Sequence, residues 1–260
     1  MQFNWVLVIG LMLMILATGC VKPTNYHQVT TPTPTVPITF TIPMQTPTPQ
    51  ATAKLISKEK SFTSNDIAYF EDVALGFEYG DNPPKVFRWL GNPITIRIYG
   101  NPDSDSLSCL NVVVSDFNQL STTTKLQISD NGKGDIDMYF LPDPEFSRIE
   151  PNYVQGNWGF FWVDYTRNCE IYHARILIST INPTTPERCH LIREELTQSL
   201  GFARDSLRYP DSIFYQKWTE TNYYSDIDKD LIKMQYNTEV PLCATKGEVE
   251  HFFSSTGTGQ

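Results

Sequence analysis

The sequence lacks several motifs that commonly indicate a function. It has no C-x-x-C pair, which argues against a zinc knuckle. It has no G-x-S-x-G nucleophile motif and no glycine-rich loop of the kind that binds phosphate groups. It also has no internal repeat. The best-known serine-hydrolase and nucleotide-binding signatures are therefore excluded, and the function has to be sought elsewhere.

Basic residues are also few. The chain has 20 Lys and Arg against 29 Asp and Glu, which gives a formal net charge of −9. A nucleic-acid backbone would be repelled by such a protein, so nucleic acid is not an expected partner. The charge is otherwise ordinary for an exported protein and indicates no substrate.

The long apolar run at residues 5–17 is too short to cross a membrane, since a spanning helix needs about 20 residues. It ends in Ala17-Thr18-Gly19-Cys20. Small residues before a cysteine at the end of a signal sequence resemble the lipobox of prokaryotic lipoproteins. The resemblance implies that residues 1–19 are a signal peptide and that a lipid on Cys20 anchors the chain to the outer face of the cell membrane. An ordinary signal peptide and an uncleaved anchor are the alternatives.

Residues 20–57 are predicted to form a lipid-anchored linker. The segment is rich in Thr and Pro, and Pro removes backbone donors and favours an extended, polyproline-like chain. It is therefore expected to be a semi-rigid stalk. Residues 58–260 then form one domain of about 200 residues.

Four cysteines follow Cys20, at Cys109, Cys169, Cys189 and Cys243. An even number in an oxidising compartment predicts two disulfides, and four cysteines allow three pairings. We prefer Cys169–Cys189 with Cys109–Cys243, because the first pair closes a short loop. Free buried thiols are the alternative.

The domain is predicted to be α+β. Apolar periodicity and capping residues predict helices over residues 65–77, 106–120, 185–200, 225–236 and 246–253. Alternation predicts strands over residues 94–99, 125–128, 135–140, 159–165 and 170–180. Thr185 is the expected N-cap of the helix over residues 185–200, and Gly201 is expected to stop it.

The most informative segment is residues 194–205, which read E-E-L-T-Q-S-L-G-F-A-R-D. It resembles the zinc-site helix of the metzincin peptidases, H-E-x-x-H-x-x-G-x-x-[HD]. Glu195 stands where that family has its general-base glutamate, and Gly201 where it has the turning glycine. Ser212, Ile213 and Phe214 resemble the turn under the metal site, S-I-M-x-Y, with Phe214 in the Met position.

This resemblance covers about residues 86–218. It is nearest to an uncharacterised family of secreted prokaryotic proteins grouped with the zincins, in which the helix reads E-E-L-x-Q-x-L-G and the turn reads S-I-F. It implies a zincin-like fold, in which a mixed sheet carries the active-site helix.

The metal-ligand positions depart from the peptidase pattern. They hold Glu194, Gln198 and Arg204, with Asp205 adjacent. Zinc sites of this kind use imidazole nitrogens, whereas Gln offers only a weak carbonyl oxygen and Arg is always cationic. We therefore expect no zinc and no other cofactor. The alternative is a harder divalent metal bound atypically through oxygen.

Helical spacing places His190, Glu194 and Gln198 on one face of the helix. One interpretation is a surface ion network that includes Arg193 and Arg204. The other is a cleft in which Arg204 pairs with Glu194 in place of a metal. Two further groups are expected to be structural. Asp137 should face solvent, and the aromatic residues between 158 and 165 should form sheet core, with sugar or peptide binding as the alternative.

The expected function is that of a cell-surface binding or scaffold protein, a pseudoenzyme without zinc peptidase activity. Its partners would be the membrane, through the lipid, and a surface peptide, protein or glycan. The alternative is an atypical hydrolase or metallopeptidase in which Glu195 is the general base.

The lipid anchor can be tested by labelling cells with a radioactive fatty acid. We expect wild-type protein to incorporate the label and Cys20→Ser to lose it, because the serine hydroxyl does not replace the thiol that is alkylated. Cys109→Ser is the matched control and should keep the label. An unlabelled wild type, or a labelled Cys20→Ser variant, would contradict the lipoprotein interpretation.

Overall fold

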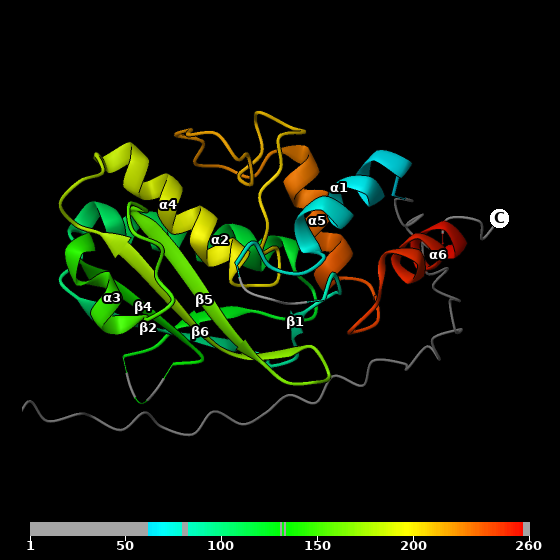
Figure 1. Cartoon of the computed structure of the whole chain (residues 1–260), viewed down its shortest axis with the longest axis horizontal. Coiled ribbons are helices and arrows are strands. Elements are labelled where there is room, and N and C mark those ends of the chain that lie inside the picture. Colours follow the sequence, from blue (N-terminus) through cyan, green and yellow to red (C-terminus); the bar gives the residue numbers. More distant parts are fainter. Residues whose placement is uncertain (1–61, 80–82, 131, 133, 257–260) are drawn as a thin grey trace, which may run out of the picture. The chain divides into compact units, whose positions relative to one another are not determined.

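The computed structural model describes residues 62–79, 83–130, 132 and 134–256, which fall within a compact unit, Ser57–Gln260. The predicted signal peptide, Cys20 and the linker lie outside the described residues. The helices are α1 (Ser64–Ala74), α2 (Ser104–Leu120), a short 3-10 turn η1 (Asp143–Glu145), α3 (Phe146–Ile149), α4 (Thr185–Gln198), α5 (Asp226–Tyr236) and α6 (Lys246–Thr256). The strands are β1 (Arg88–Trp89), β2 (Ile94–Gly100), β3 (Leu126–Ile128), β4 (Ile136–Leu141), β5 (Gly159–Tyr165) and β6 (Glu170–Ser179) (Figure 1).

The strands form one mainly parallel sheet. Its order is β1-β6-β4-β2-β3, and β5 adds to β6 as the antiparallel strand. The mixture of helices and strands predicted from the sequence is confirmed. Strand β1, η1 and α3 were not predicted, because elements of two to four residues are too short to show a period.

One face of the sheet is apolar and packs against helices. Ile96, Ile136, Ala174 and Val163 lie side by side in register across β2, β4, β6 and β5, and all four are buried. Helix α4 crosses this face close to β5 and β6 (Figure 1). The alternation of apolar residues therefore determines which side of the sheet carries α4.

The opposite face carries a charged network. His173 places its Nε2 3.1 Å from Asp137 and its Nδ1 3.2 Å from Asp164. Arg175 donates to Glu150 at 2.6 Å and to Asp164 at 3.0 Å. The expectation that Asp137 faces solvent is wrong. It is only 6% exposed, because His173 from the neighbouring strand covers it.

The N-cap of helix α4 lies one residue earlier than expected. Thr184, not Thr185, is the N-cap, and it forms a capping box with Glu187. After α4 the chain turns at Gly201, whose φ is +101°. A Cβ at Gly201 would lie 2.2 Å from the carbonyl oxygen of Phe87, so only glycine fits this turn. The predicted capping box of Ser225 and Asp228 at the start of α5 is confirmed.

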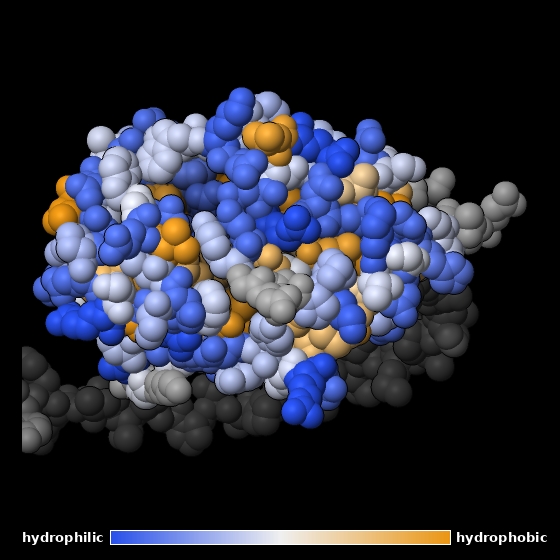
Figure 2. All heavy atoms as spheres, in the orientation of Figure 1, coloured by the Kyte–Doolittle hydropathy of each residue, from blue (hydrophilic) through white to orange (hydrophobic). Residues whose placement is uncertain are grey.

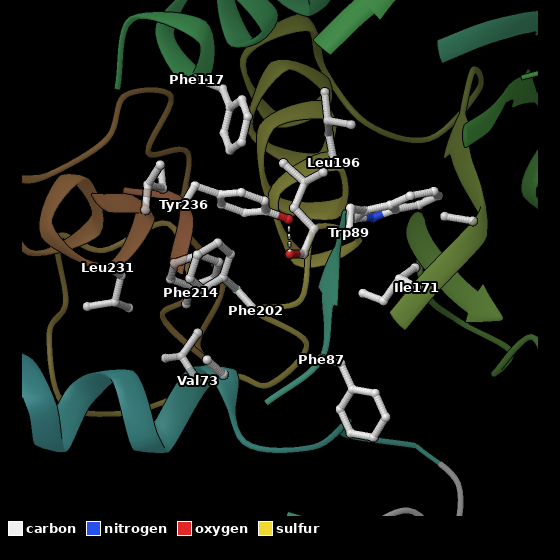
Figure 3. Close-up of a cluster of buried hydrophobic side chains, with 14 of the residues drawn as sticks. Val73, Phe87, Trp89, Phe117, Ile171, Leu196, Phe202, Phe214, Leu231 and Tyr236 are labelled. Atoms are coloured by element: carbon white, nitrogen blue, oxygen red, sulfur yellow. Dashed lines mark hydrogen bonds between the residues drawn. The ribbon is translucent and has the colours of Figure 1, made fainter. Parts of the chain in front are cut away.

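A buried cluster fixes the end of α4 against α5. Tyr236 of α5 donates a hydrogen bond of 2.7 Å to the carbonyl oxygen of Leu200 (Figure 3). Phe202 and Phe214 pack together nearby, with ring centroids 5.6 Å apart. These contacts hold the segment after α4 in place by burial and by one hydrogen bond to an otherwise free helix-end carbonyl.

On the face drawn in Figure 2, hydrophobic residues form separate small areas in a mostly hydrophilic surface. Within the described part of the chain, no helix combines the length and the apolar character needed to cross a membrane.

The two disulfides predicted from the cysteine count are present, but the preferred pairing is wrong. The bonds are Cys109–Cys189 and Cys169–Cys243. Strand β6 explains the difference, because its ten residues run for about 30 Å, at ~3.3 Å per residue, between Cys169 at its start and the loop that leads to α4 and Cys189. Closeness in sequence is therefore not closeness in space here. Cys109 of α2 instead meets Cys189 of α4 where the two helices pack.

We expect the double substitution of Cys109 and Cys189 to serine to lower the free energy of unfolding by about 4 kcal/mol, because 80 residues of sequence separation are released in the unfolded chain. Denaturant unfolding measures the loss. Peptide mapping without reductant should recover Cys109 joined to Cys189, and a peptide joining Cys169 to Cys189 would contradict the fold.

Candidate functional site

A cleft of about 710 Å³ lies along α4 and the start of β5. The segment after α1 and the loop between residues 206 and 225 complete its walls. Its acidic lining residues are Glu78, Glu187, Glu194, Glu195 and Asp205, and its aromatic ones include Tyr79, Trp158, Phe161, Tyr215 and Trp218. The cleft is therefore acidic with aromatic walls.

Helix α4 supplies most of the polar groups and is fixed by its buried side. Arg193 is 1% exposed, donates to Asp116 of α2 at 2.7 Å, and stacks over the ring of Tyr224 at 4.5 Å. Arg193 therefore does not belong to a surface network, as one interpretation of the sequence required. It orients the helix so that the residues after it, Glu194 and Glu195, reach the cleft.

His190 is the cationic partner of Glu194. The Nδ1 of His190 lies 2.7 Å from the carbonyl oxygen of Thr221, which can only accept, so Nδ1 carries a proton. Its Nε2 lies 3.2 Å from Oε2 of Glu194. Burial disfavours the charged ring, but the hydrogen bond and charge of Glu194 outweigh it and raise the pKa of His190. The pair therefore favours the imidazolium form of His190.

Gln198 and Asp205 form a second pair. The amide of Gln198 donates to Oδ1 of Asp205 at 2.7 Å. Burial raises the pKa of Asp205 to about 7, with the charges of Glu194 and Glu78 adding to the effect and the Gln198 bond opposing it. Asp205 is therefore divided between its two protonation states near neutral pH.

Glu195 is the most buried of the cleft carboxyls, at 7% exposure. A Cβ at Gly159 of β5 would lie 2.4 Å from its Oε1, so the carboxyl occupies the space that this glycine leaves. Burial, then the charges of Glu194, Asp205 and Glu78, raise the pKa of Glu195 well above its usual range. Ionising Glu195 therefore costs more free energy than ionising an exposed glutamate.

The structure places Arg204 away from Glu194. Arg204 is exposed, and its guanidinium lies 3.4 Å from the carbonyl oxygen of Leu75. It does not line the cleft, and the cation beside Glu194 is His190 instead. Glu194, Glu195, Gln198 and Asp205 are brought together as the sequence suggested. Arg204 is not, because its guanidinium is directed to the carbonyl oxygen of Leu75, while the next residue, Asp205, lines the cleft.

The predicted turn of Ser212, Ile213 and Phe214 lies in the core behind the cleft, and all three residues are fully buried. Ser212 accepts a hydrogen bond from Tyr69 of α1 at 2.7 Å and donates to Asp228 at 2.6 Å. The turn thus supports the next residues of the loop, Tyr215 to Trp218, which line the cleft.

The sequence predicted only some of the aromatic residues that line the cleft. Trp158 packs against the core, as expected, but it also lines the cleft, where it meets Trp218 edge to face at 5.4 Å. Trp218 is 56% exposed. Sequence reasoning missed Trp218 and Glu78, because both lie in irregular segments and carry no motif.

Across the residues with described positions, no three His, Cys, Asp or Glu side chains are grouped so as to hold a metal ion.

Comparison with known proteins identifies a family. A family profile described as "Protein of unknown function (DUF2927)" matches residues 64–255. No curated protein matches the chain. One similar solved structure is described as "Structure of myroilysin". It has 11% identity and a TM-score of 0.39, and the match covers 58% of this chain and 96% of that one. A likeness at this level carries no conclusion about chemistry.

The raised pKa of Asp205 predicts how stability depends on pH. Between about pH 4 and 7 the folded state binds more protons at Asp205 than the unfolded state, so this residue makes stability fall as pH rises. Asp205→Asn should remove up to about 1.4 kcal/mol per pH unit from that slope while keeping an acceptor for Gln198. Denaturant unfolding across this pH range measures the slope.

The matched control is Asp211→Asn, which changes an exposed turn residue outside the cleft and should leave the slope unchanged. Equal slopes for wild type and Asp205→Asn would contradict the assignment.

Proposed function

This chain belongs to the DUF2927 family of proteins of unknown function, and we propose that it is an exported cell-surface protein whose cleft binds a cationic group of its ligand. Two disulfides suit an oxidising compartment outside the cell. The lipid anchor at Cys20 is part of the proposal and is supported by the sequence motif. The stalk would hold the cleft away from the membrane.

The observation that carries this proposal is the crowding of carboxyl groups. The described lining contains five acidic residues, against one lysine and one histidine: Glu78, Glu187, Glu194, Glu195 and Asp205 against Lys217 and His190. Burial and mutual repulsion raise the pKa of both Glu195 and Asp205. A raised pKa means that ionising the carboxyl costs free energy. A ligand cation would reduce that cost, and this is the source of its affinity.

The walls indicate what kind of cation fits. Trp158 and Trp218 present indole rings to the same cleft, and a lysine or arginine side chain gains cation–π attraction from such rings. Within the described residues β5 pairs only with β6, so its second edge offers backbone groups beside the cleft. An extended peptide could pair with that edge and direct a basic side chain into the cleft. We therefore favour a basic peptide segment as the ligand.

The donor set does not suit a peptidase zinc ion. Gln198 is bonded to Asp205, Arg204 lies outside the cleft, and the two ring nitrogens of His190 face Thr221 and Glu194. Zinc of this type needs imidazole or thiolate ligands with a free position. The proposal is thus a zincin-like domain in which hydrogen bonds and protons occupy the place of the metal.

The second candidate is a hydrolase that uses Glu195. Its position in the cleft supports a catalytic role, and a general base contributes about 10²–10⁴-fold to a rate. The raised pKa favours Glu195 as a proton donor over Glu195 as a base. A mechanism with Glu195 as the base would therefore become faster as pH rises.

Fluorescence titration of the purified protein tests the binding proposal, because Trp158 and Trp218 lie in the cleft. The probes are a blocked hexapeptide with one central arginine and the same peptide with citrulline, which keeps the shape and removes the charge. We expect the arginine peptide to bind at least about tenfold more tightly, equivalent to about 1.4 kcal/mol. Glu194→Gln should weaken its binding.

Glu239→Gln is the matched control, since Glu239 is an exposed carboxylate outside the cleft. Equal binding of the arginine and citrulline peptides would contradict the proposal. Stoichiometric zinc in the purified protein, or peptide cleavage lost in Glu195→Gln, would favour the hydrolase instead.

A further inference from the structure

We propose that the cleft exchanges protons for the cationic group of its ligand, so that the protein releases its ligand when its surroundings become acidic. The proton-binding groups are the carboxyls of Glu195 and Asp205. This inference rests on the proposed function, because it concerns the regulation of the same cleft.

Charged groups reach the cleft from several of the elements around it. Helix α4 contributes His190, Glu194 and Glu195, while Asp205 follows it. The segment after α1 contributes Glu78, with Arg204 close enough to affect it. The start of β5 contributes only uncharged groups. The rim carries Lys217 and Glu187. The deep part of the cleft therefore holds one compensating cation, His190, for several carboxyls.

The surroundings of Glu195 do not stabilise its ionised form. Within the described residues its carboxyl has no hydrogen-bond donor or ion-pair partner, and it lies against Gly159 of β5. Its neighbour Glu194 is already paired with His190. Carboxyls that share a site do not all ionise readily, so without a cation these carboxyls hold protons to a higher pH than exposed carboxyls do.

A ligand cation changes the balance between the protonated and the ionised carboxyls. A guanidinium beside the carboxyls stabilises their ionised forms, so it lowers their pKa and a proton is released. Binding and proton release are then linked, and each strengthens the other. The pKa of Asp205, raised to about 7, places its proton exchange in the neutral to mildly acidic range. The raised pKa of Glu195 gives the cleft a second carboxyl that can release a proton. Lowering the pH protonates the carboxyls again and therefore weakens binding of the cation.

Calorimetry of the purified protein with the arginine hexapeptide tests this exchange. Arginine stays charged throughout, so the ligand itself does not titrate. Titrations at pH 5.5, 6.5 and 7.5, each in two buffers of different ionisation enthalpy, give both the dissociation constant and the number of protons released. We expect release of about one proton and an affinity that falls about tenfold for each pH unit of acidification.

Asp205→Asn should release fewer protons and show a flatter pH dependence, while Asp211→Asn, outside the cleft, should behave as wild type. A dissociation constant that does not change with pH, together with enthalpies that do not depend on the buffer, would overturn the exchange and leave the binding proposal standing. Failure of the arginine peptide to bind at every pH would overturn the proposed function and this inference with it.

Discussion

The buried carboxylate of Asp228 joins the parts of the chain that support the cleft. It accepts four hydrogen bonds, from the Ser212 hydroxyl, the Ile213 amide, and both the amide and hydroxyl of Ser225. Through Ser212 it also reaches Tyr69 of α1. One side chain thus caps α5, fixes the turn behind the cleft and links both to the first helix. The wall that carries Trp218 depends on this arrangement, because the same loop continues from the turn.

Asp228 and Glu195 show two ways of burying a carboxyl group. Burial raises the pKa of both. At Asp228 the four donors oppose that effect by stabilising the charged form, as expected for a structural carboxylate. At Glu195 no such donors are present among the described residues, and neighbouring carboxyls add to the effect of burial. A carboxyl that the fold does not stabilise as an anion is available to a ligand or to a proton.

Local patterns predicted most of the fold. The capping box at Ser225, the apolar alternation of β4 and β6, and the turning glycine at Gly201 are each encoded within a few residues, so the sequence displays them. The disulfide pairing and the partner of Glu194 depend on how distant segments meet. Arg204 seemed the natural counter-ion by its place in a motif, but His190, one turn before Glu194, already faces it. Trp218 and Glu78 belong to irregular segments, where position is set by tertiary packing alone.

The disulfide between Cys169 and Cys243 also determines what happens when a protease cuts the chain. The exposed residues Gln216 and Lys217 lie between these cysteines, as do α4 and α5. A protease that cut the chain there would produce two fragments still joined by sulfur, with α4 on one and α5 on the other. Both fragments carry buried groups that hold them together, including Tyr236 and Leu200. A nicked molecule would therefore migrate as one species until a reductant separated the halves.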